Sequence, residues 1–149
     1  SDVYKRQAPR GAVGQMTAAP QGPRGIAQGL CPCGLGMPYE ACCGRFISGV
    51  SSAPTAEALM RSRYSAYVLG DGVYIARTWA DETRPVDLQV NPAGEPFTRL
   101  QVVSTSGGGP FDAEGMVEFA AHYPGGVMRE RSRFERRAGS WVYVDGSVQ

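Results

Sequence analysis

The sequence predicts an α+β domain, with helices in its first half and an antiparallel meander in its second half. Three observations carry this prediction. Apolar residues recur at helical spacing after Pro54, polar and apolar residues alternate between Gly115 and Tyr123, and short turn sequences separate the later apolar runs. Helices followed by consecutive strands are typical of an α+β architecture.

The composition supports one globular domain with a small appendage. The chain has 149 residues, of which 42% are hydrophobic and 19% are charged. Its 15 basic and 14 acidic residues give a net charge of +1, which offers no support for a nucleic-acid or anionic-membrane partner. No apolar run approaches the ~20 residues of a membrane span, and the N-terminus lacks the apolar core of a secretory signal. We therefore expect a cytoplasmic protein.

The N-terminal region divides into three segments. Residues 1–28 are rich in Gly, Ala, Pro and Gln without any periodic pattern, so we expect a disordered tail. The first seven residues resemble translated adapter sequence and are left out of the fold prediction. Residues 29–47 hold the cysteines, and a linker rich in Ser and Gly then leads into the main domain, which is expected over residues 54–146.

Two helices are predicted after the linker. Thr55 is placed to cap the first helix, Glu57 falls in its positive first turn, and Gly70 is suited to end it. Asp71 then caps a shorter helix. Their apolar residues are Ala56, Met60, Tyr64, Tyr67 and Val68 in the first helix, and Val73, Tyr74, Ile75 and Trp79 in the second.

Four strands are predicted in the second half, over residues 97–104, 115–123, 127–137 and 141–144. Gly107-Gly108-Gly109-Pro110 breaks the first from the second, and Pro124-Gly125 and Ala138-Gly139 fit tight turns between the others. In the second strand Val117, Phe119, Ala121 and Tyr123 share one face, and Glu118, Ala120 and His122 share the other.

The cysteines follow the tail in the pattern Cys-Pro-Cys-(eight residues)-Cys-Cys-Gly. They are Cys31, Cys33, Cys42 and Cys43. Zinc prefers four soft ligands in a tetrahedron, and two short ligand pairs can supply that geometry. Gly34 and Gly36 allow the first pair to lie on a tight turn, and a helical turn over residues 38–41 would present the second pair and end at Gly44. We therefore predict one Zn²⁺ ion held by four thiolates.

Two other roles remain open for these cysteines. Disulfides would need strained pairs, Cys31–Cys33 or Cys42–Cys43, or cross-pairs that form only in an oxidising compartment. A redox role lacks the Cys-x-x-Cys motif of a βαβ unit. If zinc is bound, four thiolates leave no open coordination position, so the metal is predicted to be structural rather than catalytic.

The cysteine segment also resembles a known motif. Its sequence, Cys-Pro-Cys-Gly-Leu-Gly-Met-Pro-Tyr-Glu-Ala-Cys-Cys-Gly, is similar to the SEC-C zinc motif, named for the C-terminus of the SecA translocation ATPase. SecA usually has a histidine at the last ligand position, where this chain has Cys43, and a serine where this chain has Leu35. Neither difference removes a ligand.

The remaining sequence resembles the YchJ-like bacterial family over about residues 30–146. The stretches that carry the resemblance are Ala53–Tyr67, Thr78-Trp79, Thr83-Arg84-Pro85, Gly107-Gly108-Gly109-Pro110, Val117-Glu118-Phe119 and Glu130-Arg131-Ser132-Arg133-Phe134. Some relatives have histidine in place of Arg129, and some carry a second C-terminal SEC-C motif, which this chain lacks. The resemblance implies a nuclear transport factor 2-like cone, in which a curved antiparallel sheet wraps a long helix around a pocket. The zinc knuckle would be tethered to this cone, and the family has no established activity.

Six residues are candidates for lining a pocket in the cone. They are Arg61, Arg63, Tyr64, Tyr67, Trp79 and Glu130. Strand alternation places Glu130 on the face of Phe134, toward the core, where a buried carboxylate needs a partner. Arg61 and Arg63 on the first helix are the natural partners. Two interpretations remain open: a structural ion pair that braces helix against sheet, or a pocket that binds an anion or an acid.

Catalytic signals are weak in this sequence. Glu118 and His122 lie two alternations apart on one strand face, too far for strong direct contact as a general-base pair. The basic run is expected to form a solvated strand face; its members are Arg129, Arg131, Arg133, Arg136 and Arg137. The chain has no nucleophile motif and no phosphate loop, so no catalytic residue is predicted.

These observations favour a zinc-binding, non-enzymatic interaction module. Its knuckle would contact a protein or ribosomal partner, and the resemblance to the zinc tail of SecA, whose class engages the chaperone SecB, points the same way. The alternative is a small-molecule-binding or enzymatic cone domain, with a pocket lined by Arg61, Arg63, Tyr64 and Glu130 and with zinc only stapling the N-terminus. A nucleic-acid role is disfavoured by the charge balance.

Overall fold

The protein is described here by a computed structural model that covers residues 29–90 and 96–149. The elements in chain order are the 3-10 turn η1 (Tyr39–Ala41), the helices α4 (Cys43–Ile47), α5 (Ala56–Leu69) and α6 (Gly72–Arg77), and the strands β1 (Arg99–Gly107), β2 (Glu114–Tyr123), β3 (Gly126–Arg137) and β4 (Ser140–Val148). The prediction of a disordered tail over residues 1–28 lies outside the described residues. No helix in the described ranges is long and apolar enough to cross a bilayer.

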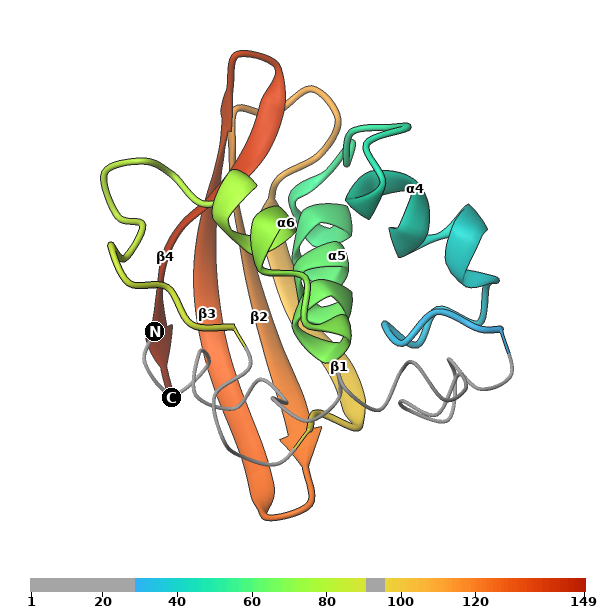
Figure 1. Cartoon of the computed structure of the whole chain (residues 1–149). Helices are drawn as coiled ribbons and strands as arrows, with labels where there is room; N and C mark the ends of the chain where they lie inside the picture. The colour runs from blue at the N-terminus through green and yellow to red at the C-terminus, as the bar shows by residue number, and fades with distance from the viewer. Residues whose placement is uncertain (1–28, 91–95) are drawn as a thin grey trace.

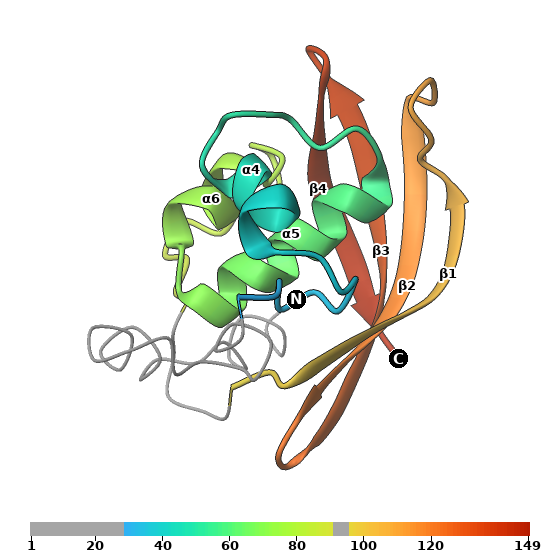
Figure 2. The same cartoon turned by 90° about the vertical axis from the view of Figure 1, so that its right-hand side faces the viewer.

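The four strands form one antiparallel sheet in the order β1-β2-β3-β4, as a meander requires. The pairing shifts register between Val102 and Ser104 and again between Arg133 and Phe134. Such irregularities bend strands, and the sheet is visibly twisted and curved in Figure 2. Helices cover one of its faces, with α5 packed against β2 and β4 (Figure 1).

The helix boundaries follow from the capping residues. Thr55 Oγ1 accepts a hydrogen bond from the Ala58 N–H at 3.0 Å, and Gly70 ends α5 with a φ of 78°. Asp71 Oδ1 accepts from the Tyr74 N–H at 3.0 Å and so starts α6. These three predicted caps are confirmed.

The prediction that Trp79 belongs to the second helix is wrong, because α6 ends at Arg77. The Thr78 carbonyl accepts from the Tyr143 N–H at 2.8 Å, and the Ala80 N–H donates to the Tyr143 carbonyl at 2.8 Å. The chain therefore leaves the helix to pair briefly alongside β4, and this pairing carries Trp79 into the core.

The predicted turns are present, but several strand ends differ from the prediction. Pro124 and Gly125 form the two-residue loop between β2 and β3, and Ala138 and Gly139 both have positive φ, as a tight hairpin requires. The first strand begins at Arg99 rather than at residue 97, and the last one continues to residue 148, four residues past the prediction. The last strand continues because β3 remains available as a pairing partner as far as Glu130.

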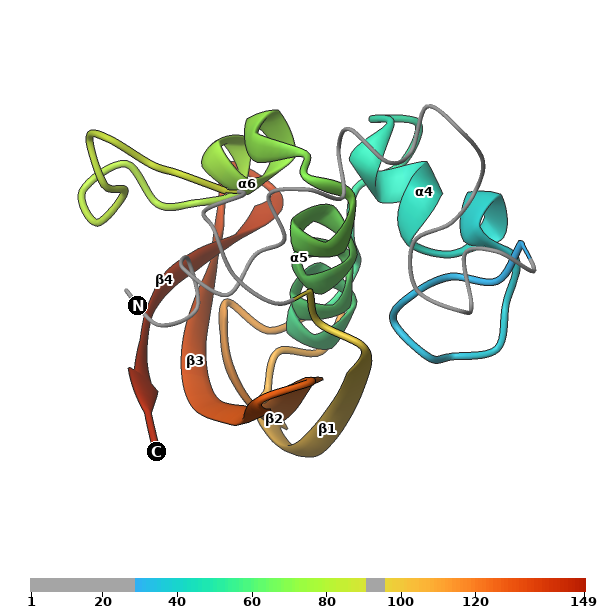
Figure 3. The same cartoon turned by 60° about the horizontal axis from the view of Figure 1, so that its bottom comes forward.

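The cysteine segment packs on α5, on the side away from the sheet (Figures 1 and 3). The prediction that Gly44 ends a helical turn is wrong, since Gly44 lies inside α4. A Cβ atom there would approach the Tyr39 carbonyl to 2.8 Å, so only glycine fits. All four cysteines belong to the same core cluster as α5 and the sheet, so the expected tethered knuckle is an integral layer of the fold.

Candidate functional site

The first cysteine pair lies on a closed loop. The Cys31 N–H donates to the Met37 carbonyl at 2.8 Å, and Leu30 forms an isolated antiparallel bridge with Pro38. Gly34 and Gly36 both have positive φ, at 89° and 83°, which lets the chain reverse within a few residues. The predicted tight turn is therefore present, and it directs both sulfurs inward.

The second pair lies at the corner between η1 and α4. The Cys42 N–H donates to the Tyr39 carbonyl at 3.0 Å, which fixes the corner, and Cys43 is the first residue of α4. All four cysteines are buried, with exposed fractions between 0% and 4%. Their four Sγ atoms lie within 4.8 Å of one another.

This cluster has the dimensions of a tetrahedral thiolate site. Sulfurs placed ~2.3 Å from a zinc ion would be separated by ~3.8 Å along each edge of the tetrahedron. The Sγ atoms of Cys33 and Cys42 are 3.6 Å apart, far longer than a disulfide bond, and all four cysteines are free. The disulfide pairing considered from the sequence is therefore not the arrangement found, and the donor set fits a soft metal ion.

The electrostatics of the cluster also favour a cation. Hydrogen bonds from Cys33 and Cys43 hold the pKa of the Cys31 thiol well below its usual range. Because Cys43 donates its hydrogen bond to Cys31, the pKa of the Cys43 thiol is raised. Burial together with the charges of Cys33 and Cys31 raises the pKa of the Cys42 thiol to about 12. The cluster thus lowers the pKa of one thiol but raises those of two others, and a divalent cation would supply the charge that four thiolates need.

Helix α5 supplies two contacts to the cysteine segment. Ser65 Oγ lies 3.5 Å from Cys31 Sγ, and Arg61 Nη1 donates to the Cys33 carbonyl at 2.8 Å. The Arg61 guanidinium is itself held by Glu57, whose Oε2 lies 2.9 Å from Arg61 Nε. These contacts hold Cys31 and Cys33 in place, in the way that outer-shell groups do in metal sites.

A second group of buried polar residues lies between α5 and the sheet. Arg63 is 2% exposed, and its Nη1 donates to the Ile75 carbonyl at 3.0 Å and to Thr78 Oγ1 at 2.6 Å. Its guanidinium stacks over the Tyr143 ring, 4.6 Å from the centroid. The Tyr143 hydroxyl in turn donates to Glu130 Oε2 at 3.0 Å, so the tyrosine links the arginine to the carboxylate.

The carboxylate of Glu130 is fully buried and accepts a second hydrogen bond, from Ser132 Oγ at 3.0 Å. Burial, followed by the charge of Glu130, raises the pKa of the Tyr143 hydroxyl. Tyr143 therefore keeps its proton and remains a donor. This network supports the interpretation of a structural brace between helix and sheet; the acid-binding alternative remains a prediction.

Two segments of the chain match known protein families. Residues 55–146 match the family described as "YchJ, middle NTF2-like domain", and residues 30–45 match the SEC-C motif. The chain belongs to the YchJ-like family. The predicted fold, a nuclear transport factor 2-like domain preceded by a SEC-C segment, is thereby confirmed.

Relatives of this YchJ-like chain span several bacterial groups. It is 54% identical over 116 residues to a UPF0225 protein of Streptomyces coelicolor, covering 78% of this chain and 93% of that protein. A UPF0225 protein of Corynebacterium glutamicum is 50% identical over 121 residues, with 79% and 96% covered. The solution structure of a SEC-C motif containing protein from Rhodopseudomonas palustris is similar with a TM-score of 0.70 and 40% identity, covering 78% and 96% of the two chains.

The YchJ-like structure separates the six predicted pocket residues into two groups. Arg63, Tyr67, Trp79 and Glu130 lie between α5 and the sheet, where Tyr143 and Thr78 join them. Arg61 and Tyr64 instead face the cysteine segment. Arg61 contacts Cys33, and burial together with the charges of Cys33 and Cys31 raises the pKa of Tyr64. The predicted pairing of Arg61 with Glu130 is therefore wrong.

The structure of this YchJ-like domain also places the Glu118 and His122 pair and the basic run of β3. Glu118 pairs with Arg131 at 3.3 Å, while His122 Nε2 lies 2.7 Å from Gln101 Oε1, so Glu118 and His122 engage different partners. Arg129, Arg131 and Arg133 alternate along the solvent face of β3, each about half exposed. The predicted solvated strand face is confirmed for these three arginines.

Ser65 and Tyr143 were not among the predicted site residues. For Tyr143, the period-two pattern of residues 141 and 143 signals burial, but only the pairing of β4 brings its hydroxyl to Glu130. Ser65 carries no local signal at all. It lies one helical turn beyond Arg61 on α5, and only the docking of the cysteine segment brings it to Cys31.

Proposed function

We propose that this chain binds one structural Zn²⁺ ion through Cys31, Cys33, Cys42 and Cys43, and that the resulting metal-stapled loop is a docking element for a protein partner. The observation that carries the proposal is the convergence of four buried sulfurs within 4.8 Å of one another. Four thiolates complete the coordination shell of zinc, so the metal would hold the loop in shape without performing chemistry.

The loop between the two cysteine pairs carries the surface for this role. Leu35 is 52% exposed and Met37 is 41% exposed, and both lie on the segment closed by the hydrogen bond from Cys31 to Met37. A loop fixed at both ends loses little conformational entropy on binding, and exposed apolar side chains on such a loop are suited to an apolar recess of a partner. A ribosomal protein or a chaperone fits this description.

Removal of the two apolar side chains tests the docking role without touching the ligands. We expect the Leu35→Ser/Met37→Ser double variant to keep its zinc and its fold but to lose its specific partners in affinity capture followed by mass spectrometry. Val86→Ser is the matched control, because Val86 is fully exposed at a distant loop. Identical partner sets for the wild type and for the folded double variant would contradict the docking role.

The metal role is tested separately with Cys42→Ser. Loss of one ligand should release the zinc and, with it, the docking loop, so partner capture should fail together with metal content. A Cys42→Ser protein that keeps a wild-type fold and captures the same partners without zinc would overturn the link between metal and docking.

A further inference from the structure

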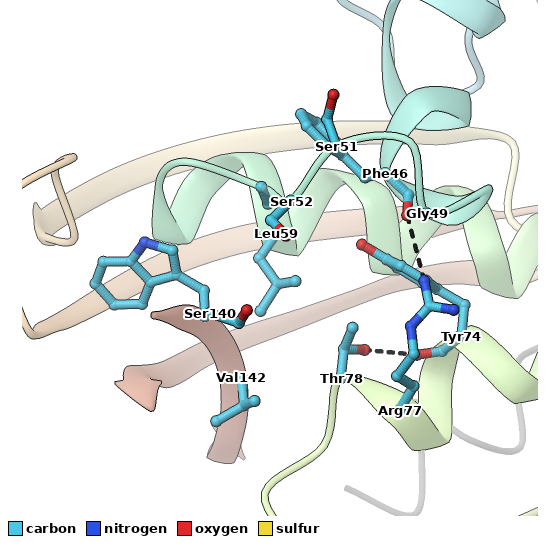
Figure 4. A pocket seen from close by; sticks show the side chains of 12 residues that line it. Phe46, Gly49, Ser51, Ser52, Leu59, Tyr74, Arg77, Thr78, Ser140 and Val142 are labelled. Atoms are coloured by element: carbon cyan, nitrogen blue, oxygen red, sulfur yellow. Dashed lines mark hydrogen bonds between the residues drawn. The ribbon is translucent and has the colours of Figure 1, made fainter. Parts of the chain in front are cut away.

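A cleft of about 360 Å³ opens where the cysteine segment, α5, α6 and β4 meet (Figure 4). It is separate from the cysteine cluster. Phe46 from α4 and the linker residues 49 and 51–53 form one side, and Ser140 and Val142 from the start of β4 form another. Tyr74 and Arg77 on α6 close a third side, and the volume is in the range of small-molecule sites.

The floor and walls of this cleft are largely apolar and are held in place. Leu59 on α5 lies at its centre in Figure 4, and Trp141 lines it from β4. The Trp141 indole N–H donates to the Pro54 carbonyl at 3.1 Å, and the Arg136 guanidinium stacks over the same ring. The aromatic wall is therefore preformed and does not need to be ordered by a ligand.

One guanidinium stands at the end of the cleft. Arg77 Nη2 donates to the carbonyls of Phe46 and Ile47 at 3.3 and 3.4 Å, and its guanidinium stacks over the Tyr74 ring. Within residues 29–90 and 96–149, no carboxylate oxygen lies within 4.0 Å of Arg77, although most arginines of the sheet have one. Among the residues that the structure describes, its charge thus lies at the cleft without an acidic partner.

We propose that this cleft binds a small molecule with an apolar body and a single carboxylate. The carboxylate pairs with Arg77, and the hydroxyls of Ser51, Ser52 and Ser140 line the same cleft. The apolar body lies between Leu59 and the Trp141 indole. Arg77 is exposed, so water solvates its guanidinium when no anion is bound, and the acid is preferred over its neutral isosteres by the charge-assisted pair that it adds.

Binding of 4-phenylbutyrate and of its neutral isostere 4-phenylbutanamide to the zinc-loaded 149-residue chain tests this proposal. We expect the acid to bind about tenfold tighter than the amide, since a charge-assisted pair is roughly twice as strong as a neutral hydrogen bond. Isothermal titration gives the affinities, and amide chemical-shift changes should centre on residues 51–53 and 140–142.

Variants of the cleft separate recognition from folding. Arg77→Gln should reduce the affinity for the acid to that for the amide while leaving the amide affinity unchanged, which shows that the cleft is intact. Arg77→Lys should retain part of the preference, and Arg129→Gln on the outer face of the sheet should retain all of it. Equal affinity for acid and amide, an undiminished preference in Arg77→Gln, or shifts centred elsewhere would overturn the proposal.

The same experiment distinguishes two sources of such a carboxylate. N-acetylphenylalanine presents the carboxyl terminus of a peptide, whereas 4-phenylbutyrate lacks a peptide group. If N-acetylphenylalanine binds more tightly than 4-phenylbutyrate, and its amide does not, the proposal is supported and the natural ligand is the carboxyl terminus of a peptide. Tighter binding of 4-phenylbutyrate supports it with a free organic acid.

Discussion

The hydroxyl of Ser65 makes the single side-chain hydrogen bond from α5 to a cysteine sulfur within the described residues, at 3.5 Å from Cys31 Sγ. A hydroxyl that donates to a metal-bound thiolate stabilises its negative charge and fixes its orientation. We therefore expect the zinc affinity to respond to a substitution of Ser65, although the same substitution at another buried serine of α5 would leave the affinity unchanged.

We predict that Ser65→Ala lowers the zinc affinity about tenfold, a typical effect of losing an outer-shell partner. Competition with a chromogenic chelator measures the affinity. Ser62→Ala is the control, because Ser62 is equally buried on α5 but bonds Tyr74 and the Leu59 carbonyl rather than a cysteine. If the two variants release zinc equally easily, Ser65 has no part in the site.

At the same scale, the orientation of Glu130 could be predicted and its partner could not. Strand alternation correctly placed Glu130 and Phe134 on the core face of β3. Which base or donor meets a buried carboxylate depends on strands and helices far away in the chain. Here a tyrosine hydroxyl takes that position, and Arg63 contacts the tyrosine ring from the opposite side.

At the scale of elements, the pairing of β3 with β4 makes room for the buried carboxylate. Gly146 lies opposite Ser132 in this pairing, and a Cβ atom at Gly146 would overlap the Glu130 side chain. A glycine in the interior of a strand usually weakens it, so its presence here indicates close approach of another group.

We predict that Gly146→Ala destabilises the fold by about 1–3 kcal/mol, because the carboxylate must move from a well-packed position. Urea denaturation of the zinc-loaded protein measures the change in the free energy of unfolding. Ser147→Ala, on the neighbouring exposed position, should stay within about 0.5 kcal/mol of the wild type. A neutral effect of Gly146→Ala would show that Glu130 does not occupy the position described.

The elements themselves were predicted best where local chemistry determines them. The caps at Thr55, Gly70 and Asp71 and the turn at Pro124-Gly125 depend on residues within a few positions of one another. The end of α6 could not be predicted from local pattern, because the competing interaction is a backbone pairing with β4, more than sixty residues later.

At the scale of the whole molecule, α5 lies between the sheet on one side and the cysteine segment on the other. Sequence spacing predicted the four ligands, but it suggested a knuckle separate from the cone. That suggestion was wrong, because Cys33 and Phe46 belong to one buried core with residues of α5, and such burial is a property of the assembled fold. Loss of the metal should therefore lower the stability of the entire domain, including the wall of the cleft that α4 provides.

Acid should weaken the metal-bound fold. Thiolates in the zinc-bound state have pKa values below those of the unfolded chain, about 8.5, so the unfolded state binds more protons and stability falls as pH decreases. Arg133 also lowers the pKa of Asp145, and Arg137 lowers the pKa of Glu82 to about 2; these exposed pairs act in the same direction but weakly.

We predict that the melting temperature of the zinc-loaded protein falls more steeply between about pH 8 and about pH 5 than that of chelator-treated protein. Differential scanning fluorimetry at both pH values provides the measurement. Parallel decreases for the two forms would mean that the thiolates do not control the acid sensitivity.

Native mass spectrometry of the purified chain, with and without prior chelation, measures whether the four cysteines hold zinc. We expect one zinc ion per chain, with the protein mass lowered by the protons lost from the thiols, and after chelation we expect loss of that zinc together with a partial shift to higher charge states. A compact chain without metal, whose mass shows two disulfide bonds in place of the four free thiols, would contradict this expectation.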